Sequence, residues 1–487
     1  MLLVAFWFLK LYNCFVDRSI NMASLFRKKE VDMTSGNIAK QILGFAIPMA
    51  IGLIFQQLYN TVDMVIVGQF AGKQALAAVG GTTTIINTLV GFCSGLATGA
   101  GVVVSQYFGK HDKNGVERSV ATSFSLSIIL CVVMTAIGCL LAKPMLLLLN
   151  TPSDVMQPAF EYLMVYFAGI SGLLMYNMLT GIMRAVGDSK RPLIFLIISS
   201  LLNIGLDLLF VAVFKWGALG AGVATIISQF ISAIMALVAL VRSNADYRIN
   251  LKNIKIDKKI LKKILGVGLP GGFQMAITSL SNVFVHSYIN EYGTNVMSGY
   301  SIHLKLDHFI VVPAQAFALA TTTFVGQNFG AGKYKRAHRG NNVSLLMSLW
   351  VTIFTSLLFY FLARPLSSAF TTDKDVLDYA VFFSKTVVPF YFLMAFNQNY
   401  AGALRGMNKS KTPMIIMLAS FVGFRQLMLF IVSKVFPGNL LPIALVFPSG
   451  WLIATVALMT SYYLSPVVKK AKQKNKDDAL QNIEEQN

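Results

Sequence analysis

Two acidic residues stand inside long apolar stretches and are the first candidates for chemistry. Asp63 lies in LYNTVDMVIVG and Asp207 lies in NIGLDLLF. Of the 21 acidic residues, only these two fall well inside an apolar segment. A carboxylate at the centre of a bilayer costs roughly 2.5 to 3.5 kcal/mol on insertion scales, so an acid kept there is expected to have a function.

Asn203 and Thr225 add two further oxygens to this pair. Asn203 precedes Asp207 by four residues and shares its helix face. Counting from the outer ends of the expected helices places Asp63, Asp207 and Thr225 at one depth, about 10 Å from those ends. Two carboxylates, an amide and a hydroxyl form a set of hard oxygen ligands that suits Na⁺, and a buried carboxyl also holds a proton. We therefore predict that Asp63, Asn203, Asp207 and Thr225 form a cation-coupling site, and that they are the metal ligands if the ion is Na⁺.

A purely structural interpretation of the same residues stays open. Small polar side chains often join helices by hydrogen bonds within membranes. Asp207 and Asn203 would then only connect neighbouring helices, and Asp63 would line a hydrated vestibule.

The composition requires a membrane environment around these residues. The chain has 487 residues, of which 55% are hydrophobic and 13% charged, and its mean hydropathy is +0.63. Soluble globular proteins contain about a quarter charged residues. We predict an all-α integral membrane protein with twelve transmembrane helices, each at or above the ~20 residues that a span needs. The predicted spans are 41–70, 76–108, 119–142, 157–183, 192–214, 217–241, 264–290, 297–328, 342–363, 379–404, 413–435 and 441–466.

The basic residues orient this bundle. With the N-terminus inside, 32 of the 41 lysines and arginines fall in the arm, the inner loops and the tail. Positive residues mark the cytoplasmic side, so both termini are expected in the cytoplasm of a multi-pass cell-membrane protein. The net charge of +20 therefore reports orientation, and no nucleic-acid partner is expected because no aromatic and basic platform accompanies it.

An internal repeat divides the chain into two halves. LTGIMRAVGDSKRP at 179–192 recurs as YAGALRGMNKSKTP at 400–413, an offset of 221 residues. Two pseudo-symmetric six-helix lobes related by an axis along the membrane normal are typical of alternating-access transporters. We predict a cytoplasmic arm at 1–40, whose first part reads as an extended translation start, lobes at 41–241 and 264–466, a basic linker at 242–263 and a charged tail at 467–487. Glycines at 91, 95 and 99 predict a close helix contact.

Enzymatic chemistry is not indicated. No GxxxxGK[ST] string occurs, so ATP hydrolysis is not supported. No spacing typical of a catalytic nucleophile and its base is present either. We expect no cofactor, and Na⁺ or H⁺ as the coupling ion.

Four stretches give the sequence a family resemblance. IPMAIGLIFQQLYNTVDMVIVGQFAGKQALAAVG, GLATGAGVVVSQYFG, the pair RAVGDSKRP and RGMNKSKTP, and FVGQNFGAGKYKRA together resemble the multidrug and toxic compound extrusion (MATE) family over about 34–466. The resemblance implies a two-lobe antiporter that exports organic, often cationic compounds against an inward Na⁺ or H⁺ gradient. It also implies that Pro48 is the hinge at which the first helix bends.

The resemblance assigns the four coupling residues as well. One branch of the family uses an acid on helix 1, an Asn and an Asp four residues apart on helix 5, and a Thr on helix 6, and Asp63, Asn203, Asp207 and Thr225 match that pattern. Another branch places acids on helices 7 and 10 of the second lobe. Here those helices offer only neutral or imidazole groups, so no cation site is expected there; the residues are Gln274, Asn282, His286, Met394 and Asn397.

The predicted function is therefore ion-coupled export of small organic molecules by a monomer in a lipid bilayer. Cavity-lining residues are predicted to include Gln56, Tyr59, Asn60 and Asn397. A flippase for lipid-linked saccharides and an exporter of one specific metabolite remain alternatives. The flippase would need a strongly cationic cavity, whereas the basic residues within the spans are few, chiefly Lys305, Lys385 and Arg425. Substrate identity and the choice between Na⁺ and H⁺ stay open.

Overall fold

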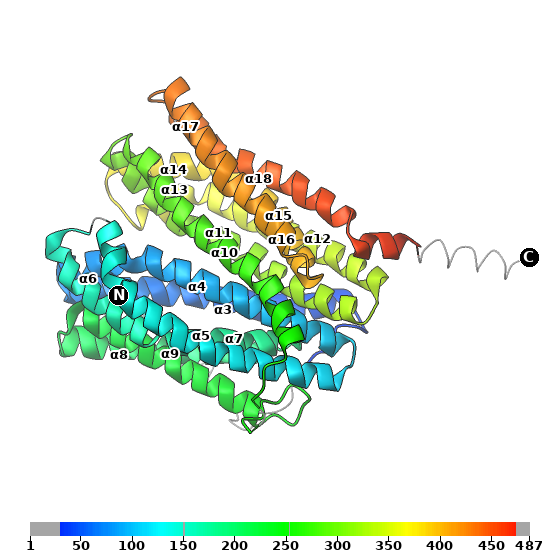
Figure 1. Ribbon diagram of the computed structural model, residues 1–487. Helices are drawn as coiled ribbons and strands as arrows, with labels where there is room; N and C mark the ends of the chain where they lie inside the picture. Colours follow the sequence, from blue (N-terminus) through cyan, green and yellow to red (C-terminus); the bar gives the residue numbers. More distant parts are fainter. Residues whose placement is uncertain (1–29, 150, 253, 474–487) are drawn as a thin grey trace, which may run out of the picture.

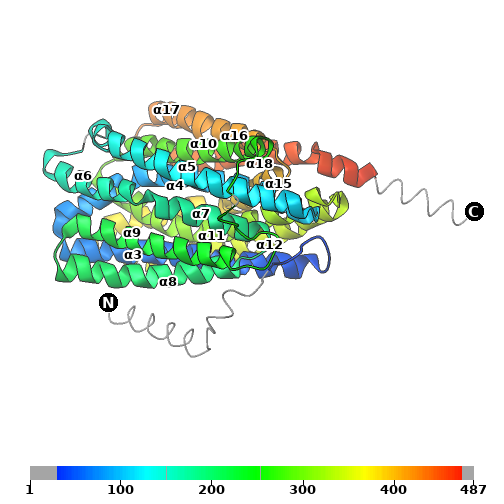
Figure 2. The same ribbon diagram turned by 60° about the horizontal axis from the view of Figure 1, so that its bottom comes forward.

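The protein is a bundle of long helices that run roughly along one axis (Figures 1 and 2). The computed structural model describes residues 30–149, 151–252 and 254–473. The N-lobe consists of α3 Ile38–Phe70, α4 Gly72–Gly109, α5 Lys113–Leu148, α6 Ser153–Ala168, α7 Ile170–Ala185, α8 Lys190–Asp207, the π-helix η1 Leu208–Val213 and α9 Gly217–Val241.

The C-lobe repeats this arrangement. It consists of α10 Lys258–Asn290, α11 Thr294–Gly330, α12 Tyr334–Phe361, α13 Ala363–Ser368, α14 Lys374–Val387, the 3₁₀-helix η2 Val388–Phe390, α15 Phe392–Gly406, α16 Lys411–Leu418, the π-helix η3 Ala419–Phe424, α17 Arg425–Val435 and α18 Leu440–Tyr463. Ten helices are long and apolar enough to span a bilayer, and two bent pairs bring the total in the described chain to twelve. The predicted twelve-span, all-helical fold is confirmed.

The bends themselves follow the repeat. The axes of α6 and α7 differ by 45° at Gly169, and α14 with η2 differs from α15 by 51° just after Phe390. These two residues are 221 positions apart, the offset found in the sequence. Pro389 within η2 lacks the N–H that a continuous helix would need, which accounts for the second break.

The connection between the lobes is shorter than expected. The linker was predicted at 242–263, but α10 already begins at Lys258. Asp257 caps this helix, since its side chain accepts hydrogen bonds from the backbone N–H groups of Ile260 and Lys259. The same hydrogen bonds, from Ile260 first, hold the pKa of Asp257 below its usual range. The capping carboxylate, and not the end of the basic run, sets this boundary.

The lobes meet through a reciprocal contact near the ends of α4 and α11. A side chain added at Gly109 would collide with the backbone of Gln327, and one at Gly330 would collide with the backbone of Gln106. Each glycine therefore packs against the repeat counterpart of its partner's glutamine. This reciprocity places the pseudo-two-fold axis of the two lobes at this contact.

A second close contact between the lobes confirms the expected role of the glycine stripe on α4. A Cβ atom at Gly95 would overlap the backbone of Gly272 on α10, and one at Gly99 would lie 2.6 Å from the backbone nitrogen of Gly268. Glycine is required here because the two helix backbones are in direct contact.

We expect Gly95→Val to push α4 and α10 apart in this half of the molecule. Direct backbone contact would give way to ordinary helix spacing of 8–10 Å, so spin labels at Lys113 and Arg339 should move apart by roughly 3 Å in electron–electron resonance measurements. Gly80→Val on the same helix is the control, since its Cβ would meet no atom within 4 Å. An unchanged distance in Gly95→Val would show that the glycine contact does not hold the lobes together.

Candidate functional site

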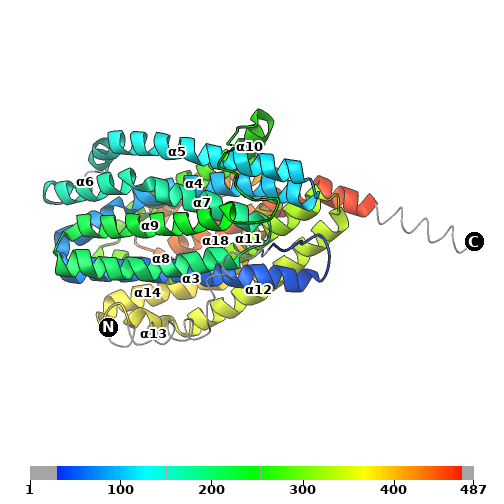
Figure 3. The same ribbon diagram turned by 90° about the horizontal axis from the view of Figure 1, so that it is seen from below.

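The acidic residues of the N-lobe meet between α3 and α8, which lie side by side with α9 (Figure 3). Asp207 is fully buried and Asn203 is 2% exposed, while Asp63 is half-buried. The carboxyl groups of Asp63 and Asp207 lie within hydrogen-bonding reach of each other. Three of the four predicted coupling residues are thus placed on facing sides of two neighbouring helices.

The polar atoms of this cluster lack partners. Both carboxylate oxygens of Asp207, Oδ1 of Asp63 and both amide atoms of Asn203 are buried without a hydrogen bond within the described part of the chain. More than nine in ten buried polar groups in proteins are hydrogen-bonded, so five orphaned atoms at one place indicate a missing ligand. The unpartnered atoms are mostly acceptors, which a cation or a shared proton would satisfy. These residues therefore fit Na⁺ as well as H⁺.

The backbone changes its hydrogen-bond pattern at this cluster. Asp207 is the last residue of α8, and the π-helix η1 follows at once. Single π-turns within longer helices often occur at functional sites, because the extra residue rotates side chains relative to the preceding turn. Here that change falls directly after the buried acid.

The remaining predicted N-lobe residues lie around the acids less directly. Thr225 is half-buried on α9, and no hydrogen bond joins its hydroxyl to either carboxyl group among the described residues. Gln56 and Tyr59 are half-buried on α3, and Asn60 is exposed. Their assignment to the coupling site and the cavity stays a prediction.

Tyr162 of α6 is a neighbour that sequence reasoning missed. Its buried side chain is close enough to both carboxyl groups to interact with them electrostatically. It lies one residue after Glu161 near the outer end of the fourth span. A tyrosine among many aromatic residues carries no signal in the sequence that would single it out.

Asn397 does not line a cavity, and this prediction was wrong. The residue is fully buried, its amide donates to the Trp451 carbonyl at 3.1 Å, and its oxygen accepts from the Thr455 hydroxyl at 3.0 Å. All of its contacts join α15 to α18. It serves packing within the C-lobe because its hydrogen-bonding groups are already used there.

Pro48 lies within α3, which is one continuous helix from Ile38 to Phe70. A proline inside a helix removes one backbone hydrogen bond and weakens the helix locally. The hinge role of Pro48 stays a prediction, since the structure shows one conformation of this helix.

The helix 7 amides of the C-lobe are occupied by arginines. Arg405 donates to Gln274 at 3.1 Å, and Arg425 donates to Asn282 at 2.9 Å. A cation site was not expected at these positions, and the two guanidinium groups agree with that expectation. Arg184 and Arg405 also stand in the last turns of α7 and α15, and Arg184 lines a cavity of about 30 Å³ between the lobes. The sequence analysis had counted both arginines with the loops.

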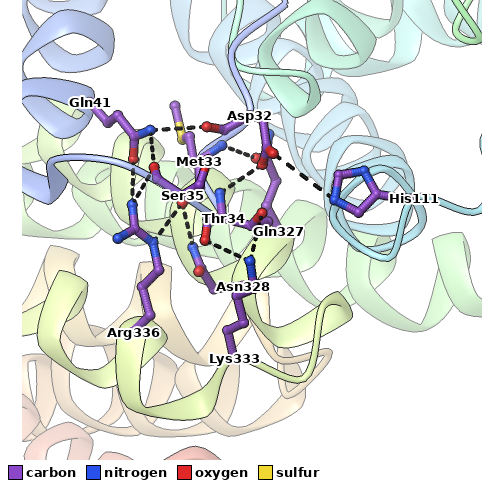
Figure 4. A network of polar contacts seen from close by, with 10 residues as sticks. All are labelled: Asp32, Met33, Thr34, Ser35, Gln41, His111, Gln327, Asn328, Lys333 and Arg336. Atoms are coloured by element: carbon purple, nitrogen blue, oxygen red, sulfur yellow. Dashed lines mark hydrogen bonds and ion pairs between the residues drawn. The ribbon is translucent and has the colours of Figure 1, made fainter.

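Residues 31–37, called the clasp here, close one end of the bundle between the two lobes (Figure 4). The Met33 N–H donates to Gln327 Oε1 at 2.8 Å, and the Gln327 amide donates to the Ala185 carbonyl at 2.9 Å. Further donors from the C-lobe to the clasp are Asn328 to Met33, Lys333 to Thr34, and Arg336 to Met33, Ser35 and Gly36. The prediction of a separate arm at 1–40 is therefore wrong for this part, whereas residues 1–29 lie outside the described chain.

We expect Gln327→Ala to loosen the clasp. The substitution removes one hydrogen bond to Met33 and one to Ala185, each worth about 1 kcal/mol, and leaves buried groups unpaired at a further cost of about 1 to 3 kcal/mol. Hydrogen–deuterium exchange of 31–41 should then be at least about tenfold faster. Gln69→Ala, at the other end of α3, should not change this rate. Equal exchange in Gln327→Ala and the unmodified protein would contradict a locking role.

Comparison with known proteins places this arrangement in a family. The MatE family model matches twice, at residues 48–209 and 270–431. The chain is 29% identical over 393 residues to the probable multidrug resistance protein YpnP of Bacillus subtilis, covering 81% of this chain and 88% of that protein. It is 26% identical over 411 residues to the probable multidrug resistance protein NorM of Thermotoga maritima, covering 83% and 88%.

Solved structures share the fold. An outward-facing multidrug resistance MATE transporter of the MOP superfamily aligns with a TM-score of 0.84 at 23% identity, covering 92% of this chain and 99% of that one. A MOP superfamily transporter from Pyrococcus furiosus aligns with a TM-score of 0.83 at 23% identity, covering 92% and 98%. Because the family model matches both six-helix halves, this multi-pass membrane protein belongs to the MatE family of efflux transporters.

Proposed function

We propose that this protein is a secondary active antiporter that exports organic, often cationic compounds in exchange for Na⁺ or H⁺. The observation that carries the proposal is the pair of facing carboxyl groups with unpartnered oxygens in the N-lobe. The relatives named as multidrug resistance proteins support the substrate class. Because family relatives are transporters, no catalytic reaction is assigned.

The orientation of the proposed cycle comes from charge. The clasp end carries the basic loops, so we place it, with both termini, in the cytoplasm of a plasma-membrane protein. In this conformation the clasp and the glycine contact close the cytoplasmic side. The acid pair then exchanges ions with the outside.

The acid pair couples the two fluxes through charge compensation. An incoming Na⁺ or proton neutralises Asp63 and Asp207, which removes the attraction for a bound organic cation and favours its release. Asn203 supplies a neutral oxygen to Na⁺, and we also assign Thr225 to this set. Cytosolic substrate would load after the clasp opens, and alternating exposure of one site is the mechanism expected for two related lobes.

Asp63→Asn and Asp207→Asn should each reduce ethidium efflux from cells by at least about tenfold. The amide keeps the shape of the side chain but removes the charge that attracts the coupling ion. Efflux is measured by fluorescence at equal membrane expression. Asp375→Asn, an exposed acid in the first turn of α14, is the control and should leave efflux unchanged. Full export by both variants would overturn the coupling assignment.

Transport in everted vesicles should depend on one ion gradient. With Na⁺ and pH varied separately, ethidium uptake is expected to follow one of the two gradients and to fall to background when that gradient is collapsed. Asp207→Asn should abolish the response because the ion no longer has its ligand. Uptake that proceeds without either gradient would favour a uniporter or a flippase and contradict antiport.

A further inference from the structure

The C-lobe carries a buried arginine near the height at which the N-lobe carries its acids. Arg425 is the first residue of α17 and follows the π-helix η3, as Asp207 precedes η1. Arg425 lies 14 residues beyond the start of α16 and Asp207 17 residues beyond the start of α8, which corresponds to roughly 21 and 26 Å along each span. The two lobes thus place opposite charges at similar depths.

The charge of Arg425 is not compensated by the protein. Its side chain is 91% buried by its own exposure of 9%, and no described acidic residue forms an ion pair with it. Nη2 donates to Ser281 Oγ at 3.0 Å and to Asn282 Oδ1 at 2.9 Å, but Nε is buried without a partner. Two neutral oxygens do not balance a buried guanidinium, which normally pairs with an anion.

Aromatic rings surround this guanidinium. Its central carbon lies 5.9 Å from the ring centroid of Phe447, and that ring lies 6.1 Å from Tyr300. His286 packs edge-on against Tyr300 at 5.6 Å. Neither the Tyr300 hydroxyl nor the His286 ring has a hydrogen-bond partner in the described structure, so both are free to donate.

Asn282 connects this pocket to the space between the lobes. It is exposed, and it follows Gly271 by eleven residues, or about three helical turns, which puts both on the same face of α10. That face contacts α4 of the N-lobe at the glycine stripe. Asn282 also stands 222 residues after Asn60, the same spacing as Pro270 after Pro48. The arginine therefore lies directly behind a residue that faces the other lobe.

We propose that Arg425, with Asn282, Tyr300 and His286, forms a binding subsite for the carboxylate of aromatic organic substrates. A carboxylate accepts two parallel hydrogen bonds from a guanidinium, and aromatic substrate rings stack on Phe447 and Tyr300. Resting on the proposed export function, this subsite assigns amphoteric aromatic acids to the substrate range. Their cationic group would face the N-lobe acids while the carboxylate binds the C-lobe.

The test uses two dyes that differ by one ester. Rhodamine 110 carries a free carboxylate, and rhodamine 123 is its methyl ester. Binding to the purified full-length protein is measured by fluorescence anisotropy without any ion gradient. Arg425→Gln should raise the Kd of rhodamine 110 at least tenfold and change that of rhodamine 123 less than twofold. Arg425→Lys should restore part of the affinity for rhodamine 110.

Asn282→Asp keeps the test decisive if Arg425→Gln does not fold. It places a carboxylate where Arg425 already donates, so it supplies the missing counter-ion and occupies the subsite. We expect rhodamine 110 binding to fall at least tenfold with no loss of thermal stability. Asn290→Asp, the same exchange at the end of α10, should change neither dye.

Three results would overturn the subsite: wild-type protein that binds neither dye, variants that weaken both dyes equally, or rhodamine 110 affinity that is unchanged in every variant. The proposed function is judged separately, because dye binding needs no gradient. Selective loss of rhodamine 110 together with full export by the Asp63 and Asp207 variants would retain the subsite and refute the coupling assignment. The reverse pattern would retain coupling and refute the subsite.

Discussion

The cost of an unpaired polar group within a bilayer is the constraint on which this structure depends. Hydrocarbon offers no partner, so each buried charge must meet a protein group, an ion or a substrate. Most buried polar side chains meet this demand inside one lobe, as Asn397 does with Thr455 and Trp451. Asp207 and Arg425 do not, because each keeps buried atoms without partners. The exceptions therefore mark the places where the molecule needs a ligand.

The same constraint explains how the lobes can separate and rejoin. Between them lie glycine backbones and a small set of hydrogen bonds, with few charges that would need new partners on opening. Backbone contact at Gly95 and Gly99 gives close packing at little desolvation cost. The clasp adds hydrogen bonds to backbone carbonyls at the edge of the bundle, where water replaces the lost partner when they break. Closure is thus tight but reversible.

Much of this was available from the sequence because it follows from counting. Hydropathy and the 221-residue offset determine the spans and the repeat, and residue counts from helix ends bring Asp63 and Asp207 to one depth. Asn397 and the clasp could not be predicted this way. Whether a polar residue is satisfied depends on its neighbour across a helix interface, and Thr455 is 58 residues away. Arg184 and Arg405 were missed because their helices continue further than hydropathy indicates.

Opposite charges in two related lobes also limit what the transporter can carry. If both lobes presented acids, an organic cation and the coupling ion would compete at every polar position. With acids confined to α3 and α8 and a guanidinium on α17, the ion competes only at the N-lobe end of a substrate. A substrate with a carboxylate would stay attached to the C-lobe after the cation displaces its basic group, so its release must wait for that second contact to break. Amphoteric compounds should therefore leave more slowly than simple cations of the same size, and the difference should disappear when Arg425 is neutralised.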